Sequence, residues 1–141
     1  MELTGRRIVV LSYPDYQELD LWFAVLRVRE AGGEAHIAGP DATVVESTLG
    51  YPALGDVDAA TLDLSGVDAF VLPSASSSPK LSDAQRDLLA RAVAAGTPVV
   101  AIGNGADALG TDGSAPTVAR LANTDQLPDL LPTLVRALSA T

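Results

Sequence analysis

The stretch Pro98-Val99-Val100-Ala101-Ile102-Gly103-Asn104-Gly105 decides the fold of this chain. Its apolar run, Val99 to Ile102, is typical of a strand buried on both faces of a parallel sheet. The strand leads directly into a sharp turn flanked by glycines, and a short helix is expected after the turn. This order of elements is that of a nucleophile elbow, which holds one side chain above the sheet. Here the apex residue is Gly103, so the turn keeps the scaffold of a catalytic elbow and lacks the nucleophile.

Strands and helices alternate along the rest of the chain. Buried strands are predicted at residues 7–12, 35–38, 69–72 and 99–102. Helices are predicted at residues 15–32, 82–96 and 125–140. This alternation predicts a flavodoxin-like α/β sandwich of three layers, with a mostly parallel sheet, formed by a single domain over residues 1–141.

The ends and faces of the helices can also be predicted. Asp15 with Glu18, and Ser82 with Gln85, have the spacing of capping boxes at the starts of the first two helices. Pro132 either kinks the last helix or marks a later start. Residues 43–64 are irregular, and a small hairpin is expected there. Apolar residues at helical spacing are predicted to form one face of the first helix: Leu19, Trp22, Phe23 and Leu26.

Composition excludes several classes of protein. With 48% hydrophobic residues the chain is too apolar to be disordered. Its net charge of −9 repels the phosphates of nucleic acids. No apolar run approaches the ~18 residues of a membrane span, and residues 1–7 have no signal-peptide pattern. We therefore expect a cytoplasmic protein with neither nucleic-acid nor membrane partners.

The chain contains no cysteine, which excludes disulfides, thiolate metal sites and any cysteine nucleophile. His36 is the single histidine and lies on a predicted strand away from Gly103, so a structural role is expected. Neither a Ser-His-Asp triad nor a zinc site is predicted, and no cofactor is expected. Acidic loop residues lack the spacing of a calcium-binding loop: Asp41, Asp56, Asp58 and Asp63.

Several phrases, taken in order, resemble the ThiJ/PfpI superfamily, the Parkinson-associated deglycase-like group with a class I glutamine-amidotransferase-like fold. The resemblance covers roughly residues 6–110 and implies the α/β sandwich predicted above. It also implies a homodimer, because most of the family are dimers. The matching phrases are Glu18-Leu19-Asp20-Leu21, Arg29-Glu30-Ala31-Gly32, Ala38-Gly39-Pro40, Gly50-Tyr51-Pro52, Asp68 to Pro73 and Ala101-Ile102-Gly103-Asn104-Gly105.

The chain departs from the family where the family's chemistry resides. Gly103 replaces the nucleophilic cysteine, and Asn104 replaces the neighbouring histidine. Ser74-Ala75 replaces the Gly-Gly pair that helps to form the oxyanion site. Residues 106–126 also form a shorter stretch than family members usually have. The family's protease, deglycase and glyoxalase activities all need the cysteine, so they are not expected here.

The retained residue is Asp20, which the resemblance places in the first turns of its helix, facing the turn at Gly103. There it would act as a general acid and base toward a substrate. The alternative is an acidic residue near a helix N-terminus, stabilised by the helix dipole by ~0.3–1 kcal/mol. Gly103 itself is open to two interpretations: relief of backbone strain after loss of function, or space for a bulkier substrate.

Further residues are predicted to bind the substrate. The backbone N–H groups of Gly103 and Asn104 would form an oxyanion site, and the Asn104 side chain either orients a carbonyl or caps a helix. Instead of binding substrate, Glu18 could be the reciprocal arm of the capping box, and the serine-rich loop could be a solvated loop. Trp22 belongs either to the core or to a dimer interface. The other predicted contacts are Tyr13, Tyr16, Glu18, Ser74 and Ala75.

Two hypotheses of function remain open. The first is a cysteine-independent enzyme that acts on a small molecule, of the lyase, hydratase, cyclase or isomerase type, in specialised metabolism. It would use Asp20 for acid–base chemistry without a covalent nucleophile. The second is a catalytically inactive binding or regulatory protein. Retention of Asp20 favours the first, because an unpaired buried charge is unfavourable; loss of the cysteine, histidine and Gly-Gly favours the second.

Overall fold

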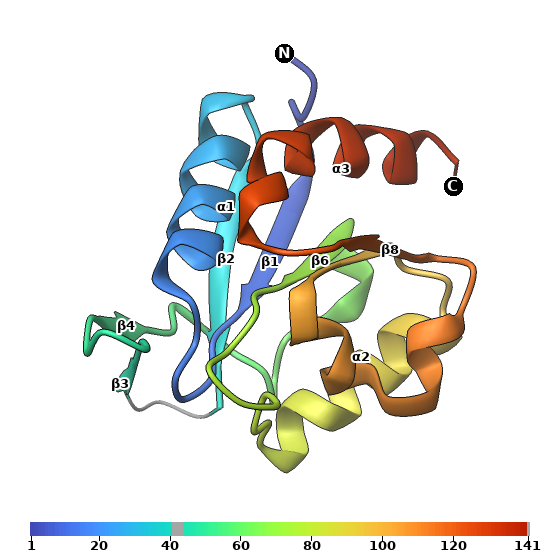
Figure 1. The fold of residues 1–141 in the computed structure, drawn as a ribbon. Helices are drawn as coiled ribbons and strands as arrows, with labels where there is room; N and C mark the ends of the chain where they lie inside the picture. The colour runs from blue at the N-terminus through green and yellow to red at the C-terminus, as the bar shows by residue number, and fades with distance from the viewer. Residues whose placement is uncertain (41–43, 141) are drawn as a thin grey trace.

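The computed structural model describes residues 1–40 and 44–140, and it contains the predicted parallel sheet (Figure 1). Six strands pair in the order β5-β2-β1-β6-β7-β8, and every pair is parallel. This is the flavodoxin-like α/β class that the sequence predicts. The strands are β1 (Arg7–Leu11), β2 (Glu34–Gly39), β5 (Val57–Asp58), β6 (Ala69–Leu72), β7 (Val99–Ile102) and β8 (Val118–Leu121).

Helices cover both faces of the sheet. Figure 1 shows α1 and α3 on one side and α2 on the other, which follows from right-handed crossovers in the two halves of the sheet. The helices are α1 (Glu18–Glu30), α2 (Asp83–Ala94) and α3 (Leu130–Ser139). Short 3-10 segments connect them: η1 (Leu64–Gly66), η2 (Gly103–Ser114) and η3 (Thr124–Asp129).

The central strands form the core. All residues of β6 and β7 are fully buried, and so are four of the five residues of β1. Their runs of Val, Ile, Leu and Phe are continuous rather than alternating because helices cover both faces of the sheet. The same pattern in the sequence predicted these three strands, so burial on both faces explains why they were found.

The start of α1 differs from the prediction: the predicted capping box of Asp15 and Glu18 is not formed. The N-cap is Gln17, whose side chain accepts a hydrogen bond from the backbone N–H of Leu19. Asp15 instead adopts a positive φ of 62°, so the chain turns there before the helix begins. Tyr16 lies in this turn, where it bridges Ser47 and Ala75. The capping box at the start of α2 is confirmed.

The face of α1 that packs on the sheet also differs from the prediction. Its buried residues are Asp20, Leu21, Ala24, Val25 and Val28. Leu19 and Leu26 are exposed, as is Trp22 at 38%, so Trp22 is not a core residue. Helix α1 carries apolar residues on two faces, and spacing alone does not decide which face meets the sheet.

Short elements complete the chain. The predicted hairpin is present as β3 (Val44–Glu46) and β4 (Pro52–Leu54), which pair antiparallel. Strands β5 and β8, at the two edges of the sheet, escaped prediction because β5 has only two residues and the exposed Arg120 interrupts the apolar residues of β8. Pro132 lies in the first turn of α3, which confirms a later start for the last helix. None of the helices in the part of the chain that the structure describes is long and apolar enough to cross a membrane.

Candidate functional site

Three segments meet where β1, β6 and β7 end. Asp20 follows β1, Ser74 and Ala75 follow β6, and Asn104 follows β7. Hydrogen bonds join Asp20 to Ser74 and Asn104 to Ala75. The carboxyl ends of parallel strands lie at one edge of the sheet, which is where α/β proteins bind ligands. This edge is the candidate active site.

Asp20 is the buried acid of this site. It is 0% exposed, and its Oδ2 accepts hydrogen bonds from the backbone N–H and the hydroxyl of Ser74, at 2.9 and 2.5 Å. Its other carboxylate oxygen, Oδ1, is also buried and accepts none. Buried polar atoms without a partner are rare in folded proteins, and each has a structural or functional reason. Asp20 is therefore the energetically unusual residue of the site.

Gly103 occupies the apex of the turn in the left-handed region, at φ 53°. A Cβ at this position would lie 3.3 Å from the Cβ of Ser74. A side chain here would thus be strained by the backbone and would press on Ser74. Two residues later, a Cβ at Gly105 would clash with the carbonyl oxygens of Leu72 and Pro73. Glycine at 105 lets η2 pack directly against the end of β6.

The side chain of Asn104 is used within the protein. Its Oδ1 accepts a hydrogen bond from the N–H of Ala75 at 2.8 Å. Its Nδ2 donates to the carbonyl oxygens of Ala75 and Ser77, at 2.9 and 3.3 Å. Asn104 therefore holds the loop after β6 in place, a role that sequence reasoning missed. Its backbone N–H remains at the start of η2, where helical residues leave N–H groups unpaired.

Tyr13 and Tyr16 are both fully buried, so neither presents a wall to solvent. The Tyr13 hydroxyl donates a hydrogen bond to the carbonyl oxygen of Pro73. Burial, followed by the negative charge of Asp20, raises the pKa of Tyr13 well above its usual value. The Tyr16 hydroxyl donates to the carbonyl oxygen of Tyr51 at 2.9 Å. Tyr13 thus ties the end of β1 to the end of β6, and Tyr16 bonds to the residue that precedes β4.

Glu18 lies apart from Asp20, toward the β3–β4 hairpin. Its Oε2 accepts a hydrogen bond from the Thr48 hydroxyl at 3.0 Å. Partial desolvation acts to raise the pKa of Glu18, but hydrogen bonds from Ser47, Thr48 and the backbone outweigh it and lower that pKa. Because Glu18 bonds to the hairpin, it is not the reciprocal arm of a capping box.

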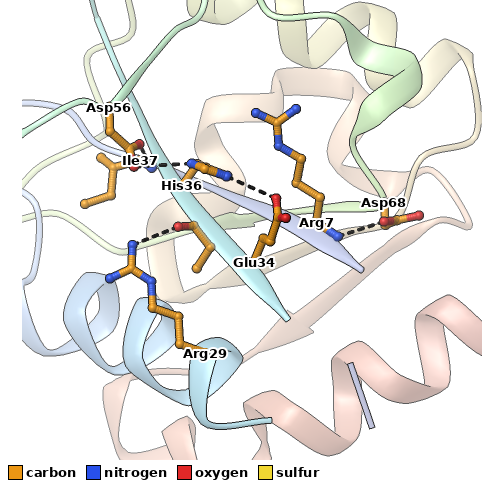
Figure 2. A network of polar contacts seen from close by, with 8 residues as sticks. Arg7, Arg29, Glu34, His36, Ile37, Asp56 and Asp68 are labelled. Atoms are coloured by element: carbon orange, nitrogen blue, oxygen red, sulfur yellow. Dashed lines mark hydrogen bonds and ion pairs between the residues drawn. The ribbon is translucent and has the colours of Figure 1, made fainter. Parts of the chain in front are cut away.

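The single histidine lies in a different polar cluster, on β2 (Figure 2). His36 lies 3.3 Å from the Asp56 carboxylate and 3.4 Å from that of Glu34. Asp56 also accepts a hydrogen bond from the N–H of Ile37 at 2.6 Å, which ties the β5 edge to β2. Figure 2 shows Arg7 with Asp68 beside this cluster, where the Asp68 carboxylate accepts from the Arg7 N–H.

The other predicted acidic loop residues bind the backbone. Asp58 caps the N–H of Ala60, and Asp63 caps that of Ser65. Asp41 lies outside the described residues. No group of three or more His, Cys, Asp or Glu side chains arranged to hold a metal occurs within residues 1–40 and 44–140.

The fold and the turn at Gly103 after β7 now define the class of this protein. A sequence model of the DJ-1/PfpI family matches residues 6–119, and the chain belongs to that family. The ThiJ/PfpI resemblance is therefore confirmed. With no cysteine, the chain is a member without the nucleophilic thiol. No curated protein sequence matches it.

Solved structures agree in fold. A ThiJ/PfpI domain protein from Brachyspira murdochii is similar with a TM-score of 0.76 at 18% identity, over 99% of each chain. An AraC family transcriptional regulator from Pseudomonas putida is similar with a TM-score of 0.70 at 21% identity, over 95% of this chain and 91% of that one. A two-domain protein from Anabaena variabilis, with DJ-1/ThiJ/PfpI-like and ferritin-like domains, gives 0.70 at 15% identity. The match covers 83% of this chain and 40% of that one.

Sequence reasoning predicts a site at this edge of the sheet, where the structure brings Asp20, Ser74 and Asn104 together, but it missed the bond between Asp20 and Ser74. Residues 54 positions apart in the chain carry no local pattern that would pair them. The available signal was the topology, since both residues follow strands that are neighbours in the sheet. The structure also reveals that Asn104 serves the loop after β6.

Proposed function

We propose that this protein is a cysteine-independent enzyme that acts on a small molecule, with Asp20 as its general acid and base. The reaction class is lyase, hydratase, cyclase or isomerase. The observation that carries the proposal is the state of Asp20, a fully buried carboxylate with Oδ2 held by Ser74 and Oδ1 without a partner. A chain under selection for stability alone would place an apolar residue here, because an incompletely paired buried carboxylate is unfavourable.

The position of Asp20 supports the same conclusion. It lies next to Ser74, whose Cβ would be 3.3 Å from a Cβ at the elbow residue Gly103. The backbone N–H groups of Gly103 and Asn104 begin the 3-10 segment η2, where they can hold a developing negative charge. A proton moved by Asp20 and a charge held by these groups together suffice for addition or elimination at a carbonyl compound.

A catalytically inactive binding or regulatory protein is the second candidate, and two observations favour it. Asp20 has no exposed surface, so a substrate reaches it only if the loop after β6 moves. The Asn104 side chain, which hydrogen-bonds to this loop, opposes that movement. The similarity of the fold to a transcriptional regulator is consistent with such a role.

An untargeted metabolite comparison separates the two candidates. Extract of the native host is incubated with wild-type protein, Asp20→Asn and the matched control Asp56→Asn, which alters an exposed carboxylate. The enzyme proposal predicts a compound that wild type and Asp56→Asn consume and Asp20→Asn does not. If no variant changes any metabolite, the binding protein replaces the enzyme, and ligands that co-purify become the target.

We also propose a homodimer formed through an apolar face on α1 and the β3–β4 hairpin. Leu19 and Leu26 of α1 are 59% and 61% exposed. A surface pocket of about 420 Å³ joins α1 to the hairpin. Large exposed apolar patches on folded proteins mark interaction sites. Other exposed apolar residues on α1 and around the hairpin are Trp22, Val44, Leu49, Tyr51 and Leu54.

Analytical ultracentrifugation tests the dimer. Wild type should sediment as a dimer, and Leu26→Lys as a monomer, because a lysine buried against a second copy would lack a partner. Ala90→Lys, on the exposed side of α2, is the matched control and should remain dimeric. A monomeric wild type at micromolar concentration contradicts this assignment.

A further inference from the structure

The loop after β6 contains two serines that each donate a hydrogen bond to an aspartate, and the two pairs differ sharply. Ser74 Oγ donates to Asp20 Oδ2 at 2.5 Å. Ser78 Oγ donates to Asp107 Oδ2 at 3.3 Å, and both of these residues are exposed. A length of about 2.5–2.7 Å is typical of a hydroxyl bonded to an ionised carboxylate. The first pair is therefore the strongly polarised one.

Asp20 has few polar partners in the part of the chain that the structure describes. It forms no ion pair with any Lys or Arg among the described residues. Within residues 1–40 and 44–140, only Ser74 donates hydrogen bonds to it, from the hydroxyl and from the backbone N–H. A carboxylate in a water-excluded site interacts more strongly with its remaining donor than an exposed one does. The Ser74 hydroxyl is thus held beside a base in a single orientation.

Ser74 is also next to the space that a side chain at the elbow would occupy. A Cβ built on Gly103 comes within 3.3 Å of the Ser74 Cβ. Ser74 is partly exposed, whereas Asp20 is fully buried, so an incoming reagent meets the serine first. Because residue 103 is glycine, no side chain of the elbow presses on Ser74, which lies in the loop just after β6.

We propose that Ser74 is the nucleophile of this site, with Asp20 as its base. The inference rests on the proposed acid–base role of Asp20 and replaces the expectation that the chain has no covalent nucleophile. A serine paired to a base attacks electrophilic carbonyl or phosphoryl centres. In the step, the Ser74 Oγ–H proton moves to Asp20 Oδ2 as Oγ bonds to the electrophilic atom. The electron pair displaced from that atom leaves with a leaving group or, at a carbonyl, goes to its oxygen.

A fluorophosphonate probe tests this assignment without knowledge of the natural substrate. The Ser74 oxygen forms a bond to phosphorus, the phosphorus–fluorine bond breaks, fluoride leaves, and the hydroxyl proton goes to Asp20. The full-length protein is incubated with the probe, and intact mass and peptide mapping locate the adduct. We expect one adduct per chain on Ser74, at least tenfold slower labelling in Asp20→Asn, and none in Ser74→Ala.

Ser78→Ala is the matched control, because Ser78 lies in the same loop and also bonds to an aspartate. It should be labelled at the wild-type rate. Thermal unfolding of each variant verifies that it folds, and the location of the adduct in wild type is decisive without any variant. Absence of an adduct on Ser74 in wild type, or equal labelling of Ser74 and Ser78, overturns the inference. Equal rates in wild type and a folded Asp20→Asn also overturn it.

The outcomes separate this inference from the proposed function. If the metabolite comparison finds turnover that depends on Asp20 and persists in Ser74→Ala, the nucleophile is wrong and the acid–base enzyme stands. If Ser74 is labelled in a manner that depends on Asp20 while no host metabolite changes, the nucleophile stands and the proposed small-molecule reaction does not.

Discussion

Polar side chains gather in two regions of this molecule, and burial distinguishes them. At the carboxyl end of the sheet, Asp20 is fully buried and 2.5 Å from the Ser74 hydroxyl. On β2, the His36 side chain is 28% exposed and lies between two carboxylates at 3.3 and 3.4 Å (Figure 2). The cluster around His36 thus contains a histidine, the residue type that acid–base catalysis uses most often. The pair of Asp20 and Ser74 contains none.

The difference teaches that the environment of a residue matters more here than its type. Water and salt screen the charges around His36, so the energies of its contacts are small. The buried pair has little screening, and a missing partner there is unfavourable. Four predictions test this contrast, beginning with the largest expected effect.

The buried region should be most sensitive at Gly105. In Gly105→Ala the new Cβ would clash with the carbonyl oxygens of Leu72 and Pro73, and backbone atoms cannot move aside cheaply. We expect a loss of about 3 kcal/mol in the free energy of unfolding, measured with urea. Gly66→Ala is the control near the surface cluster, where the Cβ would meet only the flexible end of Arg7 at 3.4 Å. Equal losses in the two variants would contradict the contrast.

Removal of the two carboxylates should give unequal losses. Asp20→Ala leaves the N–H and hydroxyl of the half-buried Ser74 without their acceptor, which should destabilise the protein by about 1–3 kcal/mol. Asp56→Ala removes a carboxylate that is 47% exposed, and of its partners only the N–H of Ile37 lies in a buried residue, so this variant should destabilise by less. Asp20→Asn retains an acceptor and should remain nearer to wild type than Asp20→Ala. Chemical unfolding of the three variants measures these differences, and a larger loss in Asp56→Ala would refute the contrast.

A thiol placed back at the elbow should conflict with Ser74. Gly103→Cys puts a side chain at a positive φ, which should lower the free energy of unfolding by about 1–3 kcal/mol. Its Cβ would also meet that of Ser74. Adding Ser74→Gly removes the second contact. We expect a double-mutant cycle to show that the double variant is more stable than the sum of the single losses by about 1 kcal/mol. Strict additivity would mean that the two positions do not share space.

The smallest effect concerns Glu18, which is less buried than Asp20. Its pKa is lowered in the folded protein from its usual value of 4.5. Its contribution to stability is therefore present above that value and disappears as the pH falls through the folded pKa. The difference in unfolding free energy between wild type and Glu18→Gln should shrink on acidification from pH 6 to pH 3. A difference independent of pH would contradict this assignment.

The core strands could be predicted from local sequence because burial on both faces requires continuous apolar runs. The capping box at Ser82 and Gln85 was predicted for a similar reason, since all its contacts lie within one helical turn. The prediction failed at Asp15, where the chain turns to bridge distant segments at Ser47 and Ala75 before α1 begins. Contacts from remote parts of the chain overrode the local preference.

The sequence by itself determined the α/β class, the elbow without a thiol and the retention of an acid at position 20. Local patterns suffice for these features, because periodicity, glycine and residue identity are written in short stretches of chain. Only the tertiary structure decided that Asp20 bonds to Ser74, that Asn104 holds the loop after β6, and that Leu19 and Leu26 face outward. Each of these depends on which segments the sheet brings together, and pairing across 54 or 29 residues leaves no trace in local spacing.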